Sequence, residues 1–262
     1  IYYLLFIICY LLFIIYYLLF VIYYLLFIIC YLLFVISRHL FYAFNIMAQE
    51  LDLLLLVNKP ADMTSHDVVN IIRKKFNTRR VGHGGTLDPF ATGLLIIGIG
   101  KATKKLTDIV GLDKTYEATA TLGATSDTYD LTGKIVARPT SHVPRQEEIE
   151  KVMESFRGSI EQKAPAYSAK KVKGKKLYEL ARAGQNVEHL RPTKKVDITE
   201  LVITDYTFPT LKFRVTCSSG TYIRSLANDI GELLECGAYL TELRRTRIGE
   251  YKLEDAKELN EL

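Results

Sequence analysis

The chain has 262 residues, of which 24% are charged and 49% are hydrophobic, and its formal net charge is +5 at pH 7. This balance predicts one or two globular domains with a mildly basic surface. Two of the four cysteines lie in an apolar repeat, and Cys217 and Cys236 lack the spacing of a C-x-x-C motif, which excludes a disulfide framework and a zinc site. We expect these two to be buried small hydrophobic residues of an intracellular protein.

Residues 1–36 carry no charge and consist of near-identical heptads that begin at Tyr3, in the order YLLFIIC, YLLFIIY, YLLFVIY, YLLFIIC and YLLFVI. A run of roughly 20 apolar residues suffices to span a bilayer. This one would form a helix of about 54 Å against a hydrocarbon core of ~30 Å. It also lacks turn residues, a basic n-region and the cleavage site of a signal peptide.

Residues 1–46 are best explained as an upstream tandem nucleotide repeat translated in frame, because the first methionine is Met47. Heptads that are apolar at every position have no solvent face and match no soluble repeat architecture. The alternative is a membrane anchor. We therefore divide the chain into a leader, residues 1–46, and a body, residues 47–262, and expect any helix in the leader to reflect its apolar sequence alone.

The body begins with residues 51–58 (LDLLLLVN), a short apolar run before a Lys-Pro pair, which predicts a buried strand and a loop. Thr64 and Asp67 then have the spacing of a capping box ahead of an amphipathic helix that extends to Phe76. Arginines and lysines from 73 to 80 form a charge cluster, which is either a solvated helix face or a phosphate contact.

Residues 81–93, VGHGGTLDPFATG, set His83 and Asp88 among four glycines, with Pro89 directly after the aspartate. Glycine permits positive φ, whereas proline fixes its own φ and biases the preceding residue toward an extended conformation. The stretch predicts a shaped loop that presents the Asp88 carboxylate, which can act as nucleophile, general base or metal ligand. The alternative is a structural turn whose aspartate caps the backbone.

The next segment, LLIIGIGKATKKL, predicts a buried strand and a helix that begins near Lys101, and its glycines do not have the spacing of a phosphate-binding P-loop. Alternation from Thr115 onward predicts a half-buried strand. In the polar loop that follows, Asp127 and Asp130 have some features of a calcium loop. Tyr129 occupies a ligand position, however, so we expect no metal there.

A proline-bounded linker precedes QEEIEKVMESF, which predicts an amphipathic helix that ends at Gly158. The next stretch, YSAKKVKGKKLYELARAG, carries five lysines from Lys170 to Lys176, flanked by Tyr167 and Tyr178. Interleaved basic and aromatic residues favour contact with nucleic acid, and the alternative is a solubilising loop.

Residues 194–206 and 211–217 predict neighbouring strands around the turn at Pro209. A helix then begins at 218–221, and its apolar face consists of Ile223, Leu226, Ile230, Leu233 and Leu234. A strand, AYLTELRRTRIGEY, and a terminal helix, LEDAKELNEL, complete the chain. Because strands and helices are interspersed without a clean βαβ repeat, we predict an α+β fold with a mixed, mostly antiparallel central sheet flanked by helices.

The segment HGGTLDPFATGLL resembles the active-site motif of TruB-type tRNA pseudouridine synthases, which isomerise the uridine at position 55 of the T loop. Further stretches match this family in the same order: VNKPADMTSHDVV, KTYEATATLGATSDTYDLTG, APAYSAKKVKGKKLYELARAG, CSSGTYIRSLANDIGELL and LRRTRIGEY. Together they cover most of Leu51 to Tyr251. The resemblance implies a pseudouridine synthase fold and makes residues 47–262 a catalytic domain.

This resemblance also implies roles for individual residues. Asp88 is the essential aspartate, and Arg224 of GTYIR forms an ion pair that keeps it charged in a water-poor pocket. Tyr116 of KTYEA stacks on the flipped base and moves a sugar proton. Whether the carboxylate attacks the sugar or the base stays open, and without the resemblance Tyr116 would be read as ordinary core packing.

Four further positions carry substrate-binding roles by the same resemblance. Tyr222 contacts the base from another side, and Leu243 of LRR forms an apolar wall, for which core packing is the alternative. His83 fills the gap that the uridine leaves in the RNA. Lys59 of the NKP segment lies near the pocket, with a structural role as the alternative.

Isomerisation of an extruded uridine requires no redox change and no added group, so we expect neither cofactor nor metal. The expected partner is the tRNA T arm, bound by a cytoplasmic monomer without a membrane or a protein partner. Family members often continue into a PUA domain, whereas this chain stops at Leu262, so we expect T-arm binding by the catalytic domain alone. The alternative is a noncatalytic tRNA-binding or RNA-chaperone protein, against which the combined presence of Asp88, Tyr116 and Arg224 argues.

Overall fold

A computed structural model of the chain describes residues 2–47, 52–140, 142–168, 170–172 and 174–262. The chain divides into two compact units, Ile1–Glu50 and Leu51–Leu262.

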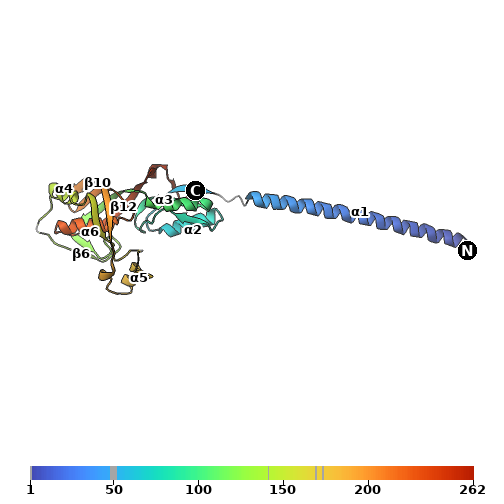
Figure 1. Cartoon of the computed structure of the whole chain (residues 1–262), viewed down its shortest axis with the longest axis horizontal. Coiled ribbons are helices and arrows are strands. Elements are labelled where there is room, and N and C mark those ends of the chain that lie inside the picture. Colours follow the sequence, from blue (N-terminus) through green and yellow to red (C-terminus); the bar gives the residue numbers. More distant parts are fainter. Residues whose placement is uncertain (1, 48–51, 141, 169, 173) are drawn as a thin grey trace. The chain divides into compact units, whose positions relative to one another are not determined.

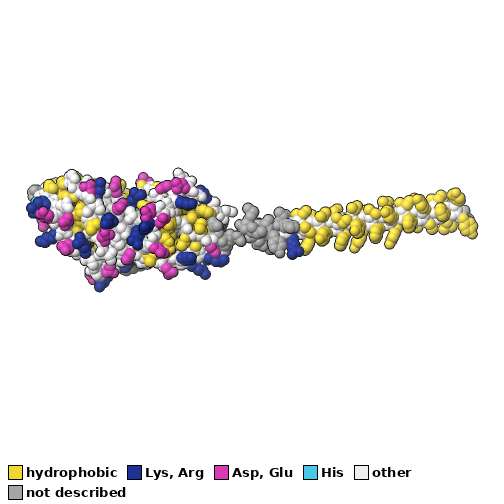
Figure 2. Space-filling view, turned by 90° about the horizontal axis from the view of Figure 1, so that it is seen from above, with side chains coloured by type: hydrophobic (Ala, Val, Ile, Leu, Met, Phe, Trp, Pro, Cys, Tyr) yellow, Lys and Arg dark blue, Asp and Glu magenta, His cyan; other side chains and the backbone are white. Residues whose placement is uncertain are grey.

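The first unit contains one long helix, α1 (Tyr2–Met47). Hydrophobic side chains cover the described part of its surface (Figure 2), and nearly all of them up to Ile36 are exposed. The segment Tyr2–Arg38 is long and apolar enough to cross a membrane by length and composition. The helix contains neither glycine nor proline, so nothing in its sequence interrupts the backbone hydrogen bonds. That the repeat is a translated upstream sequence stays a prediction.

The second unit is built on one mixed sheet (Figure 1), whose outer members are β14 and β7. Strands pair in the order β14-β1-β3-β12-β4-β11-β10-β7, with β2 on β3 and β13 on β12. Only β1 with β14 and β3 with β12 run parallel among the described pairs, which confirms the predicted mixed, mostly antiparallel sheet. Its strands are β1 (Leu53–Lys59), β2 (Val81–His83), β3 (Thr92–Ile99), β4 (Lys114–Leu122), β7 (Gly158–Lys163), β10 (Thr193–Thr207), β11 (Thr210–Cys217), β12 (Ala238–Ile248), β13 (Tyr251–Lys252) and β14 (Lys257–Glu258).

Helices and short hairpins connect these strands. The helices are α2 (Ser65–Lys75), η1 (Gly100–Lys105), α3 (Leu106–Gly111), α4 (Gln146–Glu154), α5 (Leu177–Arg182), η2 (Glu188–Leu190), α6 (Ile223–Leu233) and η3 (Leu253–Asp255), where η denotes a 3₁₀-helix. Two small antiparallel pairs, β5 (Ala124–Ser126) with β6 (Ile135–Ala137) and β8 (Lys171–Val172) with β9 (Lys175–Lys176), lie outside the main sheet. The expected α+β class is confirmed.

The two halves of the sheet are covered differently. In β3 every residue after Thr92 is buried, because α2 packs on the face of Leu95 and Ile97 while α3 packs on the face of Leu94 and Ile96. In β4 and β11 buried residues alternate with partly or fully exposed ones, and α4 and α6 contribute to the core on the buried face. The sequence patterns, continuous in the first half and alternating in the second, reflect this difference.

Local signals fix the start of α2. The Thr64 Oγ accepts a hydrogen bond from the Asp67 N–H at 3.0 Å, and the Asp67 carboxylate accepts one from the Thr64 N–H at 2.9 Å. This is the predicted capping box, which satisfies two backbone donors at the helix end.

Cys217 and Cys236 are both buried, as expected.

Two expectations for the C-terminal part were wrong. The segment predicted as a terminal helix contains the short η3 and then β14, which pairs in parallel with β1. The backbone of Lys257 and Glu258 pairs with the edge of β1, and this tertiary pairing overrides the helix propensity of the segment. On α6, Leu233 is 58% exposed, so the fully buried part of its apolar face ends at Ile230.

Candidate active site

A cavity of about 400 Å³ opens at the end of α6 and beside β4 and β12. Five of the seven residues singled out in the sequence line it: Asp88, Tyr116, Tyr222, Arg224 and Leu243. They come from a loop, a helix end and two strands that are far apart in the sequence. The fold therefore brings most of the predicted set together.

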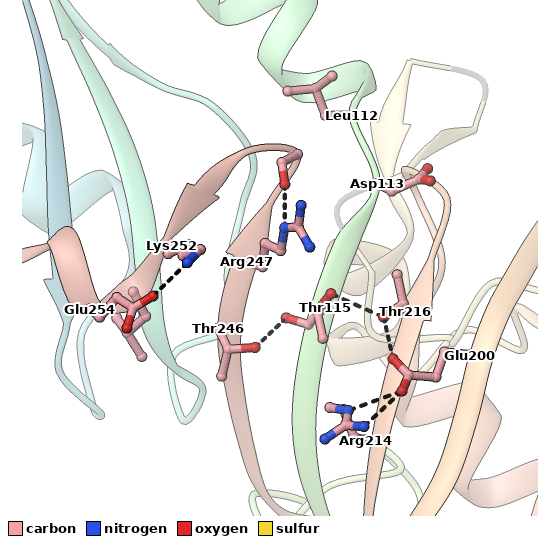
Figure 3. A pocket seen from close by; sticks show the side chains of 12 residues that line it. Leu112, Asp113, Thr115, Glu200, Arg214, Thr216, Thr246, Arg247, Lys252 and Glu254 are labelled. Carbon is pink, nitrogen blue, oxygen red and sulfur yellow. Dashed lines mark hydrogen bonds and ion pairs between the residues drawn. The ribbon is translucent and has the colours of Figure 1, made fainter.

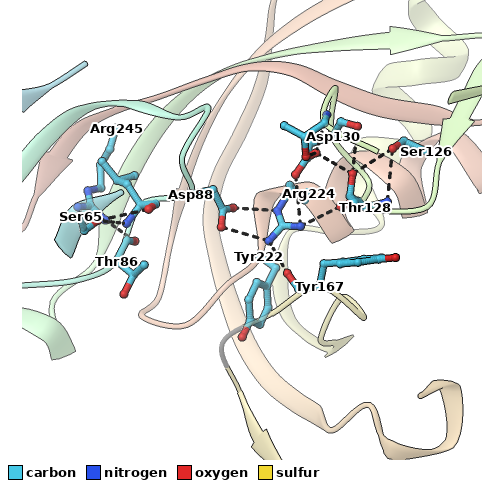
Figure 4. Close-up of polar contacts among 12 residues, drawn as sticks. Ser65, Thr86, Asp88, Ser126, Thr128, Asp130, Tyr167, Tyr222, Arg224 and Arg245 are labelled. Atoms are coloured by element: carbon cyan, nitrogen blue, oxygen red, sulfur yellow. Dashed lines mark hydrogen bonds and ion pairs between the residues drawn. The ribbon is translucent and has the colours of Figure 1, made fainter. Parts of the chain in front are cut away.

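Asp88 and Arg224 form the predicted ion pair (Figure 4). The Arg224 Nε donates to Asp88 Oδ2 at 2.8 Å, and Nη2 donates to Oδ1 at 3.2 Å. This two-point geometry fixes the plane of the carboxylate as well as its position. The Arg224 side chain is 5% exposed, whereas that of Asp88 is 35% exposed, so the carboxylate remains accessible from the cavity.

The Arg224 guanidinium also donates to main-chain carbonyls of two other segments. Nη1 donates to the Thr128 carbonyl at 2.8 Å, and Nη2 donates to the Tyr167 carbonyl at 3.1 Å. The Asp130 carboxylate lies 3.4 Å from Nη1 and is itself buried. Asp130 therefore anchors the arginine, a role that the sequence reading of its loop did not identify.

Arg245 holds the loop that carries Asp88. This side chain is 1% exposed, and it donates to the carbonyls of Leu94 at 2.8 Å, Gly85 at 3.1 Å and Thr86 at 3.4 Å. A buried guanidinium with several carbonyl acceptors fixes all of them relative to one strand. The sequence contained a signal for it, because Arg245 lies two residues after Leu243 in β12 and so points to the same face.

Lys59 holds the same loop from the other side. Its side chain is completely buried, and Nζ donates to the carbonyls of Pro60, Met63 and Pro89, the last at 3.1 Å. Burial lowers the pKa of Lys59 to about 8, and the negative charge of Asp88 opposes this effect. Lys59 does not line the cavity. It contacts the residue directly after Asp88, so its observed contacts are structural.

Gly93 ends the loop in a conformation that other residues rarely adopt. Its φ is +99°, and a Cβ at this position would lie 2.4 Å from the carbonyl oxygen of Arg245. The glycine therefore permits the close parallel approach of β3 to β12, where Gly93 pairs with Arg245. This contact places the Asp88 loop beside the cavity-lining part of β12.

Tyr116 and Leu243 contribute the apolar wall of the cavity. They lie on the neighbouring strands β4 and β12, and they are 8% and 7% exposed, respectively. Burial raises the pKa of Tyr116, and the charge of Arg245 opposes that rise. The phenol is therefore neutral near pH 7 and can donate or accept a hydrogen bond.

Tyr222 lies at the N-terminal end of α6, two residues before Arg224. Burial raises the pKa of Tyr222, while the neighbouring Ser168 hydroxyl and the positive charge of Arg224 oppose the rise. Ser168 is itself buried and lines the cavity. The helix end thus supplies one aromatic and one cationic group to the same space.

His83 lies in β2, and it is not among the residues that line the cavity. Burial is the main cause that lowers its pKa, with the positive charge of Arg245 acting in the same direction. A neutral imidazole at physiological pH follows from this environment. The structure therefore leaves the predicted substrate contact of His83 without direct support.

Cations other than Arg224 also face the cavity. Lys114, Lys170 and Arg245 line it. Lys114 is 5% exposed, and its Nζ donates to the Val110 carbonyl at 2.7 Å; burial lowers its pKa to about 8. These positive charges outnumber the single negative charge of the Asp88 carboxylate, and they favour a polyanionic ligand.

A second cavity of about 790 Å³ lies on the opposite face of the sheet (Figure 3), where Thr115 rather than Tyr116 points. Its charged side chains are largely paired with one another, including Arg214 with Glu200 at 2.8 Å and Lys252 with Glu254 at 3.0 Å. It contains none of the seven sequence-predicted residues. The smaller cavity around Asp88 is therefore the candidate active site.

The chain matches two family models. Residues 73–223 match the TruB family pseudouridylate synthase (N terminal domain), and residues 224–262 match the tRNA pseudouridylate synthase B C-terminal domain. The boundary between them falls at the start of α6, immediately before Arg224, so the two matched regions share one cavity.

Two relatives named tRNA pseudouridine synthase B illustrate the sequence similarity. The Chlamydia pneumoniae protein is 47% identical over 203 residues, which are 77% of this chain and 85% of the relative. The Geobacillus kaustophilus protein is 48% identical over 212 residues, or 78% of this chain and 74% of the relative.

Solved structures show the same fold. A chain of a Cbf5-Nop10-Gar1 complex is 30% identical, with a TM-score of 0.62 over 81% of this chain and 54% of that chain. A chain of an H/ACA RNP bound to a substrate RNA containing 2'-deoxyuridine is 29% identical, with a TM-score of 0.61 over 84% of this chain and 54% of that chain. This chain thus spans about half the length of those solved chains. On the sequence matches and the fold together, the chain belongs to the TruB family of pseudouridylate synthases, which are isomerases.

Proposed function

We propose that the chain isomerises the T-loop uridine of tRNA, position 55, to pseudouridine, with Asp88 as the nucleophile. The single observation that carries this proposal is the accessible Asp88 carboxylate, oriented at two points by the buried Arg224 in a cavity lined by cations. The names of the relatives, tRNA pseudouridine synthase B, supply the substrate class.

The substrate uridine is stacked within folded RNA, so it must be extruded before the cavity can receive it. Extrusion costs a few kcal/mol, which stacking and apolar contacts offset. Tyr116 and Tyr222 supply aromatic surfaces for the flipped base, and Leu243 supplies an apolar wall. Closing this apolar space around the base excludes water from the reacting atoms.

The reaction exchanges one glycosidic bond for another. The C1′–N1 bond breaks and its electron pair stays on the uracil. The Asp88 carboxylate either attacks the sugar or the base, and the bond that it forms breaks again before the product leaves, or it stabilises the positive charge at C1′. The detached base rotates, C5 forms the new bond to C1′, and the proton at C5 is lost while N1 gains one. The neutral Tyr116 phenol is the group we assign to proton movement at the sugar.

RNA binding outside the cavity is assigned to the basic segment between Lys170 and Lys176. Lys170 lines the cavity and is exposed, and Lys175 is exposed in β9. The segment therefore extends from the cavity edge into solvent, where phosphates of a bound T arm can reach it. A role for His83 in the gap left by the uridine stays part of this proposal.

The proposal is tested by incubating the body, beginning at Met47, with a T-arm RNA and detecting pseudouridine chemically. We expect product at the T-loop uridine and none when that uridine is replaced by cytidine. A chain that binds the RNA without forming product would instead support the noncatalytic tRNA-binding alternative.

Replacing Lys170, Lys175 and Lys176 together by alanine tests the RNA-binding segment. We expect weaker binding and a shallower dependence of log K on log salt, by roughly 0.7 to 0.9 per lost phosphate contact. The single-turnover rate at saturating enzyme is expected to stay within about twofold of the unsubstituted chain, because this segment is assigned to phosphate binding and not to the chemical step. A collapse of that rate would move the segment into the active site.

Action without a protein partner, expected from the sequence, stays a prediction. The monomeric state and the cytoplasmic location expected from the sequence stay predictions, as does the absence of a membrane role for α1.

A further inference from the structure

Gln162 is the one residue of β7 that is fully buried. The strand lies at the edge of the sheet and pairs with β10, where Gln162 lies opposite Lys194. The rest of β7 is exposed or half-buried, whereas Gln162 is 3% exposed. A buried position on an edge strand usually holds an apolar side chain, since burying an amide is costly unless its polar atoms are paired.

Both polar atoms of the Gln162 amide are paired with a single residue of α6. The Oε1 accepts from the Tyr222 N–H at 2.7 Å, and Nε2 donates to the Tyr222 carbonyl at 3.0 Å. Tyr222 has an extended backbone, with φ of −100° and ψ of 106°, so its N–H and carbonyl point to the same side. The amide therefore binds Tyr222 as a neighbouring strand would.

This contact fixes a helix end that has no local cap. Tyr222 is the N-cap residue of α6, and its own side chain makes no capping hydrogen bond. A second link from the same strand supports the same end, because the Ser225 Oγ donates to the Lys163 carbonyl at 3.1 Å. Between these two links lies Arg224, whose orientation toward Asp88 depends on where the helix begins.

We propose that Gln162 is a positioning residue for the isomerisation: it sets the main chain of Tyr222 and, through it, the approach of Arg224 to Asp88. The inference rests on the proposed function. Only an amide side chain offers an uncharged donor and acceptor side by side, which explains why a glutamine occupies this buried place. Gln162 touches neither the carboxylate nor the cavity around it; it acts through the helix end.

The test compares Gln162→Met with Gln146→Met in the full chain, kept in mild detergent. Methionine keeps the length of the side chain and removes both hydrogen bonds, and Gln146 is an exposed glutamine on α4 that serves as the matched control. Single-turnover rates are measured with a T-arm RNA at saturating enzyme, together with RNA affinity and amide hydrogen exchange at Tyr222. The exchange measurement reports the loss of the Gln162 contact independently of activity.

For Gln162→Met we expect faster exchange at the Tyr222 amide, a rate at least tenfold lower and an RNA affinity within about threefold of the unsubstituted chain. The Gln146→Met control should leave all three unchanged. An unchanged rate with the Tyr222 amide exchanging faster, or a loss confined to thermal stability, would overturn the inference. No product from the unsubstituted chain would contradict the proposed function instead.

If Gln162→Met does not fold, Gln162→Glu takes its place. The introduced carboxylate retains an acceptor for the Tyr222 N–H and loses the donor to the Tyr222 carbonyl. We expect the Tyr222 amide to stay protected and the rate to fall at least threefold. A rate equal to that of the unsubstituted chain would overturn the inference.

Discussion

All three nitrogens of the Arg224 guanidinium donate hydrogen bonds. Nε and Nη2 donate to the Asp88 carboxylate, Nη2 also donates to the Tyr167 carbonyl, and Nη1 donates to the Thr128 carbonyl. Lysine at this position would keep the charge, but its ammonium cannot reproduce the planar two-point contact. The carboxylate would lose its fixed orientation, and the half-buried carbonyls of Thr128 and Tyr167 would lose a donor.

We therefore expect Arg224→Lys to lower the single-turnover rate at least about a hundredfold and to lower the free energy of unfolding by ~2 kcal/mol. Arg214→Lys is the matched control, because Arg214 pairs with Glu200 on the surface and its side chain is 45% exposed. That variant should lose at most ~0.5 kcal/mol of stability and no activity. Equal rates for the two variants would refute the orienting role of Arg224.

Lys114 should make stability depend on pH. Burial lowers the pKa of Lys114 from 10.5 to about 8, so between these values the unfolded chain binds more protons than the folded one. The free energy of unfolding then rises with pH across that window. Chemical denaturation from pH 8 to 9.5 should show a smaller rise for Lys114→Met than for the unsubstituted chain, while Lys212→Met, at an exposed lysine, should not differ. A steeper rise for Lys114→Met would contradict the burial argument.

At the residue scale the sequence predicted the ion pair between Asp88 and Arg224, because both residues lie in distinctive motifs. It did not predict Asp130, Arg245 or Gln162 as supports. Their partners are mostly main-chain atoms of segments far away in the sequence, and any residue type supplies such atoms. Sequence spacing therefore gives no signal for the contacts of Asp130 and Gln162, and for Arg245 it indicates only the face of β12 on which the side chain lies.

The contact between β3 and β12 depends on one glycine. Gly93 has φ of +99°, and an added Cβ would meet the backbone of Arg245 at 2.4 Å. Gly93→Ala should therefore separate the strands and lower the free energy of unfolding by more than ~2 kcal/mol. Because the same contact positions the Asp88 loop, we expect the rate of the folded fraction to fall as well.

Gly111→Ala is the control for this change. Gly111 lies at the end of α3, and an added Cβ there would meet nothing within 4 Å. Its effect on denaturant unfolding should stay within ~0.5 kcal/mol. Similar losses for both alanine variants would show that the tight approach at Gly93 is not what stabilises the sheet.

The predicted helices and strands agree with the structure where the prediction rested on neighbouring residues in the sequence. The capping box at Thr64 predicted the start of α2 correctly, and the alternation from Thr115 onward predicted β4 as a half-buried strand. The C-terminal segment was predicted as a helix, yet Lys257 and Glu258 pair with β1. This strand forms because the edge of β1, more than 190 residues earlier in the chain, is available for pairing. Local helix propensity contains no information about such a distant partner.

The whole catalytic unit is assembled by the sheet. β4 and β12 lie side by side although β12 begins long after β4 ends, and α6 packs against β12. This order brings Tyr116, Leu243 and Arg224 to one cavity beside the Asp88 loop. Periodicity and the order of the predicted elements indicated the α+β class, but the strand order follows from long-range pairing and was not predicted.

The most direct measurement of the central claim is the single-turnover yield of pseudouridine with Asp88→Asn. Asparagine keeps the shape of the side chain and removes the charge that Arg224 orients, and Asp205→Asn, at an exposed aspartate, serves as the control. We expect the loss of product formation with Asp88→Asn, with RNA binding retained, and full activity with Asp205→Asn. Pseudouridine formed by Asp88→Asn at the rate of the unsubstituted chain would contradict the account.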